Sequence, residues 1–275
     1  MPKTPPTWSL LVVWFAFAAH LASAAPLENR AAGSATTLEG SVYAISVFVS
    51  TPDAPWDDAA KDRMLARQEI AESWLVRQAT EYDVALSFDH GTLGRTSDIV
   101  LKHIVQGDGS GDEPVDVVSR ILRQAGYSNP SALHGWAARY KQCDHVVVLL
   151  YANLTGIGYS MAFAPEMDHD LYFLEGTMLY RAYPGGSEMA AASIAHEILH
   201  LFGAWDLYET FEQTEDRARK ATQLFTDDIM RRTSYDIEEL EVGGLTAWRV
   251  GWHDEPESYF EWFRTPGGQY GPVPP

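Results

Sequence analysis

The chain has 275 residues, of which 46% are hydrophobic and 12% aromatic, so it can bury a large core and is neither disordered nor fibrous. The chain contains 38 Asp and Glu residues and 20 Lys and Arg residues, which gives a formal charge of -18. This charge excludes nucleic acid and anionic membrane surfaces as expected partners. The single cysteine, Cys143, cannot form an intramolecular disulfide or a thiolate cluster, so a metal would need histidine and carboxylate ligands.

The N-terminus has the features of an export signal. One basic residue, Lys3, precedes an apolar run from residue 8 to residue 21 and the small-x-small sequence Ala22-Ser23-Ala24. We therefore predict a signal peptide over residues 1–24 and a secreted or periplasmic protein with no stable membrane insertion after cleavage; an uncleaved N-terminal anchor is the alternative. The small and polar residues 25–40 are predicted to form a linker.

Hydrophobic patterns along the next part of the chain predict a mixed, twisted sheet covered by helices, an α+β fold whose N-terminal lobe is α/β-like. Strands are predicted at residues 41–50, 84–88, 145–151, 159–163 and 171–174. Helices are predicted at residues 57–82, 115–125 and 131–140, the last two separated by Asn129-Pro130.

A long apolar helix is predicted within residues 187–208, SEMAAASIAHEILHLFGAWDLY. Ser187 is a candidate N-cap, and Gly203 is expected to end the helix in a left-handed turn. Apolar side chains surround this helix, so it should run through the interior of the protein. The polar residues that it carries therefore need a functional explanation.

Two of those polar residues have the spacing of metal ligands. His196 and His200 are four residues apart, so they lie one turn apart on one helix face, where both imidazoles can bind one zinc ion. Asp206 follows the turn at Gly203 and is the candidate third ligand, which leaves the fourth position for water. Glu197 can accept a proton from that water as it attacks a peptide carbonyl. The pattern predicts a zinc-dependent endopeptidase, and a chance HExxH in a core helix is the alternative.

The sequence HEILHLFGAWD resembles the HExxHxxGxxH/D motif of the metzincin zinc metalloproteases, in the version with Asp as third ligand. The resemblance implies a methionine turn beneath the metal, and Asp228-Ile229-Met230, 24 residues after Asp206, is similar to that turn. A core methionine is the alternative for Met230. Tyr208 and the sequence LTAWRVGW at residues 245–252 also resemble immune-inhibitor-A-type and snapalysin-type exported proteases.

Further roles follow from the resemblance alone. It implies that Tyr208, or else Tyr235, donates a hydrogen bond to the oxyanion formed during attack, although an amphipathic aromatic residue at a helix exit explains Tyr208 equally well. It also implies an edge strand that pairs with extended peptide substrate, for which Gly156, Gly158 and Tyr159 are the candidates. Ordinary turn glycines are the alternative there.

The metzincin-like catalytic domain is predicted to span residues 41–253. Within it we expect a larger N-terminal lobe over residues 41–203, which contains the buried zinc-binding helix, and a smaller C-terminal lobe over residues 204–253 with the methionine turn. The tail at residues 254–275 is rich in Pro, Gly and aromatic residues and is expected to be an extended strap or mobile.

Two other functions remain open at this point. A protein that keeps the fold and the zinc but lacks catalysis would act as a binding module for a partner. An enzyme that takes a glutamate as third ligand, as gluzincins do, would use Glu212 or Glu215. Cys143 precedes a predicted central strand and is interpreted as a small buried residue rather than a thiol that blocks the zinc. A polar cluster at Glu166, Asp168, His169 and Asp170 could bind calcium, but a solvated loop is the simpler interpretation.

Overall fold

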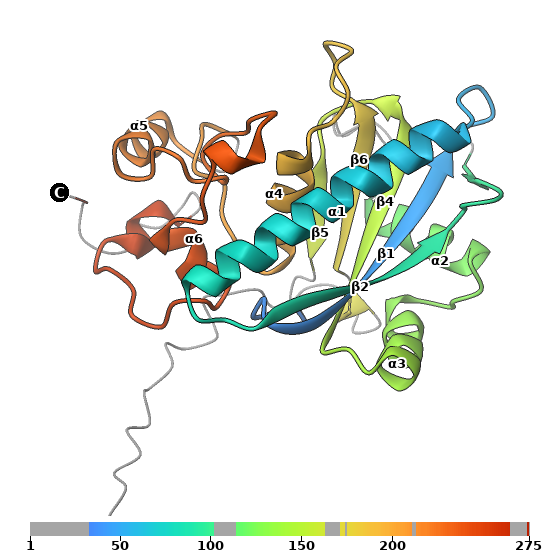
Figure 1. The fold of residues 1–275 in the computed structure, drawn as a ribbon, viewed down its shortest axis with the longest axis horizontal. Coiled ribbons are helices and arrows are strands. Elements are labelled where there is room, and N and C mark those ends of the chain that lie inside the picture. Colours follow the sequence, from blue (N-terminus) through green and yellow to red (C-terminus); the bar gives the residue numbers. More distant parts are fainter. Residues whose placement is uncertain are drawn as a thin grey trace, which may run out of the picture.

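The computed structural model describes residues 33–101, 114–162, 171–173, 175–210, 213–264 and 274, with the backbone alone for residues 114–117 and 162. The expected signal peptide and the polar cluster at residues 166–170 lie outside these residues. A mixed sheet with helices on both faces confirms the predicted α+β fold (Figure 1). No helix in the described part of the chain is long and apolar enough to span a membrane.

The sheet has the strand order β2-β1-β4-β6-β5, and β3 pairs with the end of β1 after β2 has ended. Its strands are β1 (Gly40–Ser50), β2 (Leu86–Leu93), β3 (Ile99–Val100), β4 (His145–Thr155), β5 (Tyr159–Ala162) and β6 (Glu175–Ala182). All neighbouring strands run parallel except β5, which is antiparallel to β6 and forms one edge. The central strands β1 and β4 are buried on both faces, which explains their continuous apolar runs.

The helices are α1 (Asp58–Glu81), α2 (Pro114–Gln124), α3 (Pro130–Lys141), α4 (Ala191–Leu201), α5 (Glu215–Leu224) and α6 (Gly244–Arg249), with short 3-10 turns at η3 (Ile237–Glu239) and η4 (Phe260–Phe263). Helices α1 and α4 pack together on one face of the sheet, and α2 and α3 lie on the other (Figure 1). Helices α5 and α6 lie to one side of the sheet (Figure 1). The Asp57 carboxylate begins α1 by accepting from the Ala60 amide at 2.7 Å.

Two predicted strands are placed wrongly. The strand expected at residues 84–88 begins at Leu86, because Asp83 adopts a left-handed conformation and the Val84 amide still donates to Ala79 of α1. The strand expected at residues 171–174 is wrong, since Leu171–Phe173 form a turn and β6 begins at Glu175. Glu175 and Gly176 at the start of β6 interrupt its apolar pattern, which hid this strand in the sequence.

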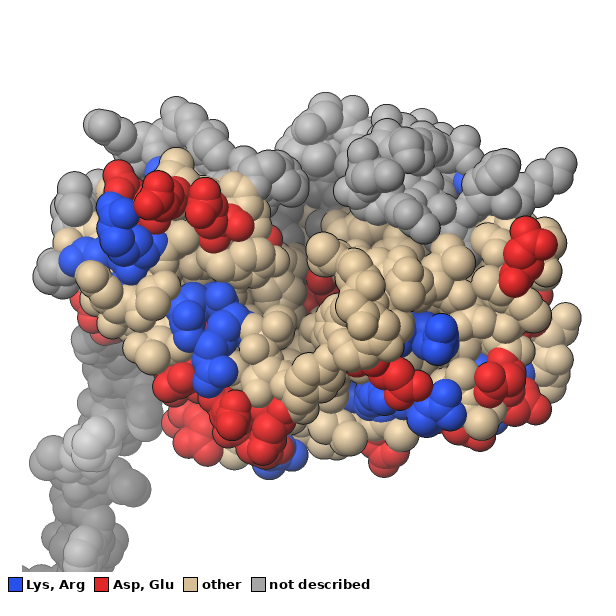
Figure 2. All heavy atoms as spheres, turned by 90° about the horizontal axis from the view of Figure 1, so that it is seen from above, with Lys and Arg blue, Asp and Glu red and all other residues tan. Residues whose placement is uncertain are grey.

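Segments on both sides of the expected catalytic domain pack against it. The Ala35 amide donates to Glu175 at 3.1 Å, and Leu38 is fully buried with its amide donating to Val250. Phe260 of the C-terminal tail is also buried. Seen from above, blue and red side chains lie interspersed on the surface rather than in one acidic patch (Figure 2).

Candidate metal centre

Helix α4 begins later than expected, and a residue outside the helix caps its N-terminus. Its first residue is Ala191, and the predicted cap at Ser187 is wrong, because Ser187 lies four residues before the helix. The Tyr183 hydroxyl takes the capping role: it accepts from the Ala190 amide at 3.0 Å and lies 2.7 Å from Ser193 Oγ. At the other end, Gly203 has a φ of 92°, the left-handed turn that was predicted there.

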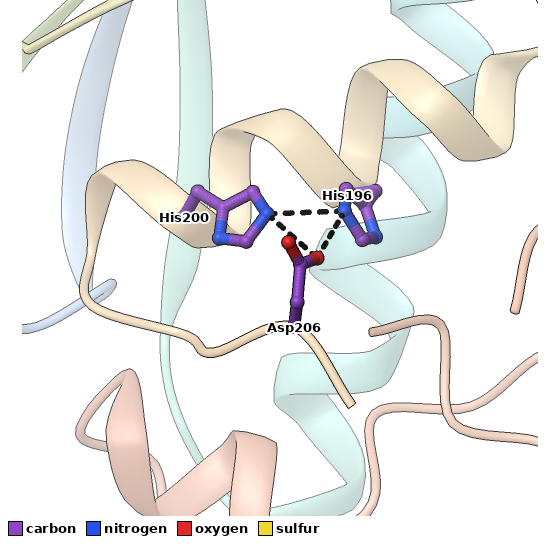
Figure 3. A group of neighbouring side chains, drawn as sticks. All are labelled: His196, His200 and Asp206. Carbon is purple, nitrogen blue, oxygen red and sulfur yellow. Dashed lines mark hydrogen bonds and ion pairs between the residues drawn. The ribbon is translucent and has the colours of Figure 1, made fainter. Parts of the chain in front are cut away.

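The three predicted metal ligands converge (Figure 3). His196 Nε2 and His200 Nε2 are 3.1 Å apart, and Asp206 Oδ1 lies 3.2 Å from each of them. A tetrahedral zinc ion with ligand bonds of about 2.0–2.1 Å would separate its ligand atoms by about 3.3–3.4 Å. The observed spacing therefore fits three corners of such a tetrahedron.

The outer nitrogens of both rings are already engaged. His196 Nδ1 lies 3.0 Å from the carbonyl oxygen of Ile229, and His200 Nδ1 lies 3.0 Å from that of Ala204. Each Nδ1 must therefore carry a hydrogen, which leaves a lone pair on each Nε2 of the neutral rings. Asp206 Oδ1 is buried and then faces two lone pairs without a donor. Three acceptors at this spacing need a positive charge between them, either a proton or a metal ion, and two imidazoles with one carboxylate form a donor set that fits zinc.

Without a metal, the charges of the cluster favour a protonated His200. Burial lowers the pKa of His200, but the hydrogen bond and the charge of Asp206 outweigh burial and raise that pKa to about 9. Burial would raise the pKa of Asp206, but the two histidines hold it well below its usual range. A metal would have to displace the proton that His200 holds.

The segment around Met230 supports two of the three ligands. Ile229 supplies the carbonyl that faces His196, and the Met230 carbonyl accepts from the amide of Leu207, the residue after Asp206, at 2.8 Å. Met230 itself is fully buried. Met230 lies in a turn next to the ligands, and its predicted role as the methionine beneath the metal remains a prediction.

Asp228 holds this turn in shape. It is fully buried, and its carboxylate accepts from the Met230 amide at 2.7 Å, the Gly243 amide at 3.0 Å and the Thr246 hydroxyl at 2.7 Å. Burial raises the pKa of Asp228 to about 6 despite these bonds. A Cβ at Gly243 would lie 2.7 Å from Asp228 Oδ2, so the close approach requires glycine. The local sequence around Asp228 did not predict this role.

Glu197, the predicted general base, is buried beside the ligands and lies against β5. Its Oε2 accepts from the Ser160 hydroxyl at 2.7 Å. A Cβ at Gly158 would lie 3.0 Å from Glu197 Oε1, so this glycine allows the carboxylate to approach the strand closely. Ser160 was not predicted as a site residue, because nothing in its local sequence indicates which helix the strand contacts.

The two candidate tyrosines lie in different surroundings. The ring centroid of Tyr208 is 6.1 Å from that of His196, and the residue is 39% exposed. Tyr235 is 68% exposed and packs edge-on against Tyr183, the residue that caps α4. The geometry thus places Tyr208 beside a ligand and Tyr235 near the start of the helix, and the oxyanion role of either residue remains a prediction.

The predicted substrate-binding residues lie where β5 begins, at the edge of the sheet. Gly156 packs against the ring of Tyr180, since a Cβ there would lie 2.7 Å from that ring. Tyr159 pairs with Met178 of β6 in antiparallel register. An edge strand is therefore present at this position, and its use by a substrate remains a prediction.

Other candidates from the sequence are not brought to the centre. Glu215, offered as a gluzincin-type ligand, lies at the start of α5 and pairs with Arg219 at 3.6 Å. Glu212 lies outside the described residues. Cys143 is half-buried, and burial raises the pKa of its thiol. It is not among the converging ligand groups found in the described part of the chain.

No known family model matches this chain, and no curated protein sequence matches it. Among solved structures, metalloproteinase-II from Bacteroides fragilis is similar, with a TM-score of 0.40 and 12% sequence identity. The match covers 80% of this chain and 55% of that chain, so this chain spans about half the length of that protein. The structural neighbour is thus a metalloproteinase, and the metal centre described above rests on its own geometry.

Proposed function

We propose that this chain is an exported zinc-dependent endopeptidase of metzincin type. The observation that carries the proposal is the convergence of two Nε2 atoms and one carboxylate oxygen at 3.1–3.2 Å, with both Nδ1 atoms held by backbone carbonyls. The position of Glu197 directly after His196 on α4 adds a buried carboxylate at the same centre. The apolar N-terminal run supports export.

His196, His200 and Asp206 would hold the zinc ion, which, when bound, acidifies water and polarises a carbonyl as a Lewis acid. Glu197 would accept a proton from the attacking water and return it to the leaving amine. The edge of β5 would pair with the backbone of an extended peptide, so recognition would tolerate different side chains. Tyr208 would donate to the oxygen that gains charge during attack.

The proposal is tested with the purified mature chain. We expect one zinc per chain, cleavage of casein, and loss of cleavage with a chelator that is restored by added zinc. The variant Glu197→Gln should keep its zinc and lower kcat by about 10²–10⁴-fold, because it removes the proton acceptor. Unchanged turnover in this variant would refute the mechanism. Zinc at full occupancy without cleavage of any member of a diverse peptide library would instead favour the catalytically silent binding module.

A further inference from the structure

Ser160 makes the hydrogen bond that holds the Glu197 carboxylate. It lies on the edge strand β5 and is half-buried, with its side chain turned toward α4. Its Oγ is 2.7 Å from Glu197 Oε2 and 2.8 Å from the main-chain carbonyl oxygen of Glu197. One hydroxyl thus contacts both the side chain and the backbone of the residue after His196.

The other carboxylate oxygen lies against the same strand. A Cβ at Gly158 would be 3.0 Å from Glu197 Oε1, and Gly158 precedes Ser160 by two residues. Gly158, directly before β5, and Ser160 on β5 therefore face the two oxygens of the same carboxylate and form one surface for it. A glutamate side chain has several rotamers, and this surface selects one. We propose that Ser160 is a positioning residue that holds Glu197 in one orientation beside the metal ligands.

A serine hydroxyl can donate its one hydrogen to a carboxylate oxygen. Ser160 Oγ lies within hydrogen-bond distance of both Glu197 Oε2 and the Glu197 carbonyl oxygen, so it contacts the side chain and the backbone of the same residue. These two contacts limit the orientations that the Glu197 carboxylate can adopt. This role rests on the proposed endopeptidase function.

The variant Ser160→Ala removes the hydroxyl and keeps the backbone of β5. We expect kcat to fall about 10- to 100-fold, because a displaced catalytic group costs this much, while KM stays within about twofold. Zinc should remain at one per chain. Ser160→Thr keeps a hydroxyl in a strand and should restore most of kcat. A merely structural Ser160 would instead lower the melting temperature and leave kcat of the folded protein unchanged, which would overturn the proposal.

Thr177 offers a matched control. It pairs with Ser160 in the sheet register and is fully buried, and its hydroxyl has no hydrogen-bond partner among the described residues. Thr177→Val therefore removes a buried hydroxyl from the neighbouring strand without removing a hydrogen bond to Glu197. We expect kcat of this variant to stay within about twofold of the wild type. A fall equal to that of Ser160→Ala would show a general effect of altered packing and would overturn the specific role of Ser160.

A second measurement does not depend on activity. In the zinc-loaded protein with ¹³C-labelled glutamate, the Glu197 carboxyl signal is assigned by its loss in Glu197→Gln. We expect this signal to move toward an averaged position in Ser160→Ala and to keep its place in Ser160→Thr and Thr177→Val. An unmoved signal in Ser160→Ala overturns the positioning role. Absence of cleavage by the zinc-loaded wild type overturns the proposed function, and the carboxyl signal still decides whether Ser160 positions Glu197.

Discussion

Helix α4 and the irregular segment that follows it, residues 202–208, both contribute ligands to the centre, but different interactions fix their positions. The helix supplies His196 and His200 through its regular repeat, which brings residues four apart onto one face. Asp206 comes from a stretch without helix or strand, and its position depends on separate contacts made after Gly203. Two ligands therefore follow from local helical geometry, while the third depends on the packing of distant residues.

Two contacts hold the irregular segment. The Arg249 guanidinium donates to the Gly203 carbonyl at 2.8 Å and lies 4.0 Å from the centre of the Trp205 ring. On the other side of Asp206, Leu207 donates to Met230 at 2.8 Å. Asp206 is therefore held between anchors on α6 and on the turn at Met230, and the strength of these anchors can be tested separately from that of the helix.

The largest effect is expected from Asp228→Asn, which weakens the anchor at Met230. The carboxylate accepts three hydrogen bonds through two oxygens, and an amide replaces one oxygen with a donor that faces another donor. The turn that holds His196 and Leu207 should loosen, so zinc affinity should fall about 10- to 100-fold, as it does when residues supporting metal ligands are removed. A chelator competition titration measures this change.

Thr246→Val is the matched control for that experiment, since it removes one of the three donors and keeps the carboxylate. It should lower zinc affinity less than Asp228→Asn does. Equal zinc affinity in Asp228→Asn and the wild type would show that the irregular segment holds Asp206 without the turn.

Strand β6, part of the regular sheet, is also anchored to a segment without helix or strand, through Glu175. Its Oε1 accepts from the Ala35 amide and the Ser34 hydroxyl, each at 3.1 Å. Burial raises the pKa of Glu175 from 4.5 to about 8, despite these bonds. The folded protein thus keeps a proton that the unfolded chain releases, so this contribution to stability is complete below about pH 4.5 and is lost as the pH rises through about 8.

Glu175→Gln removes the titratable carboxyl group and keeps a side-chain oxygen that can accept from Ser34 and Ala35. At pH 8–9 we expect the variant to melt at least about 2–4 °C above the wild type, the shift that about 1 kcal/mol gives in a domain of this size. Melting curves recorded from pH 5 to pH 9 measure the difference, which should shrink as the pH falls. The exposed Glu81 provides the control variant Glu81→Gln, which should follow the wild type. A constant difference across this pH range would contradict the assignment to Glu175.

The smallest effect is expected at the start of α4. Tyr183→Phe removes the hydroxyl that accepts from the Ala190 amide and should lower the free energy of unfolding by about 1 kcal/mol, as loss of a helix cap does. Ser187→Ala should change it by less than about 0.5 kcal/mol, because Ser187 lies outside the helix. Urea unfolding of both variants measures this difference. A larger loss in Ser187→Ala would restore Ser187 as the cap.

Much of the fold could be predicted from patterns within short stretches. The central strands β1 and β4 were predicted from continuous apolar runs, and α1 was predicted from its helical periodicity. Strand β6 was missed because Glu175 is buried at its start, bonded to residues about 140 positions earlier. A buried glutamate reads as a polar surface residue until the segment that covers it is known.

For the centre itself, the local sequence pattern was sufficient to place His196, Glu197 and His200 on one apolar helix. It also predicted the turn at Gly203 that ends this helix. Both could be predicted because helical geometry depends only on residues within a turn of one another. Tertiary structure alone decided that Asp206 returns to both rings, that the Ile229 carbonyl orients His196, and that Ser160 holds Glu197. The last two contacts join residues more than 30 positions apart in the chain, so they arise only when β5, α4 and the turn at Met230 pack together.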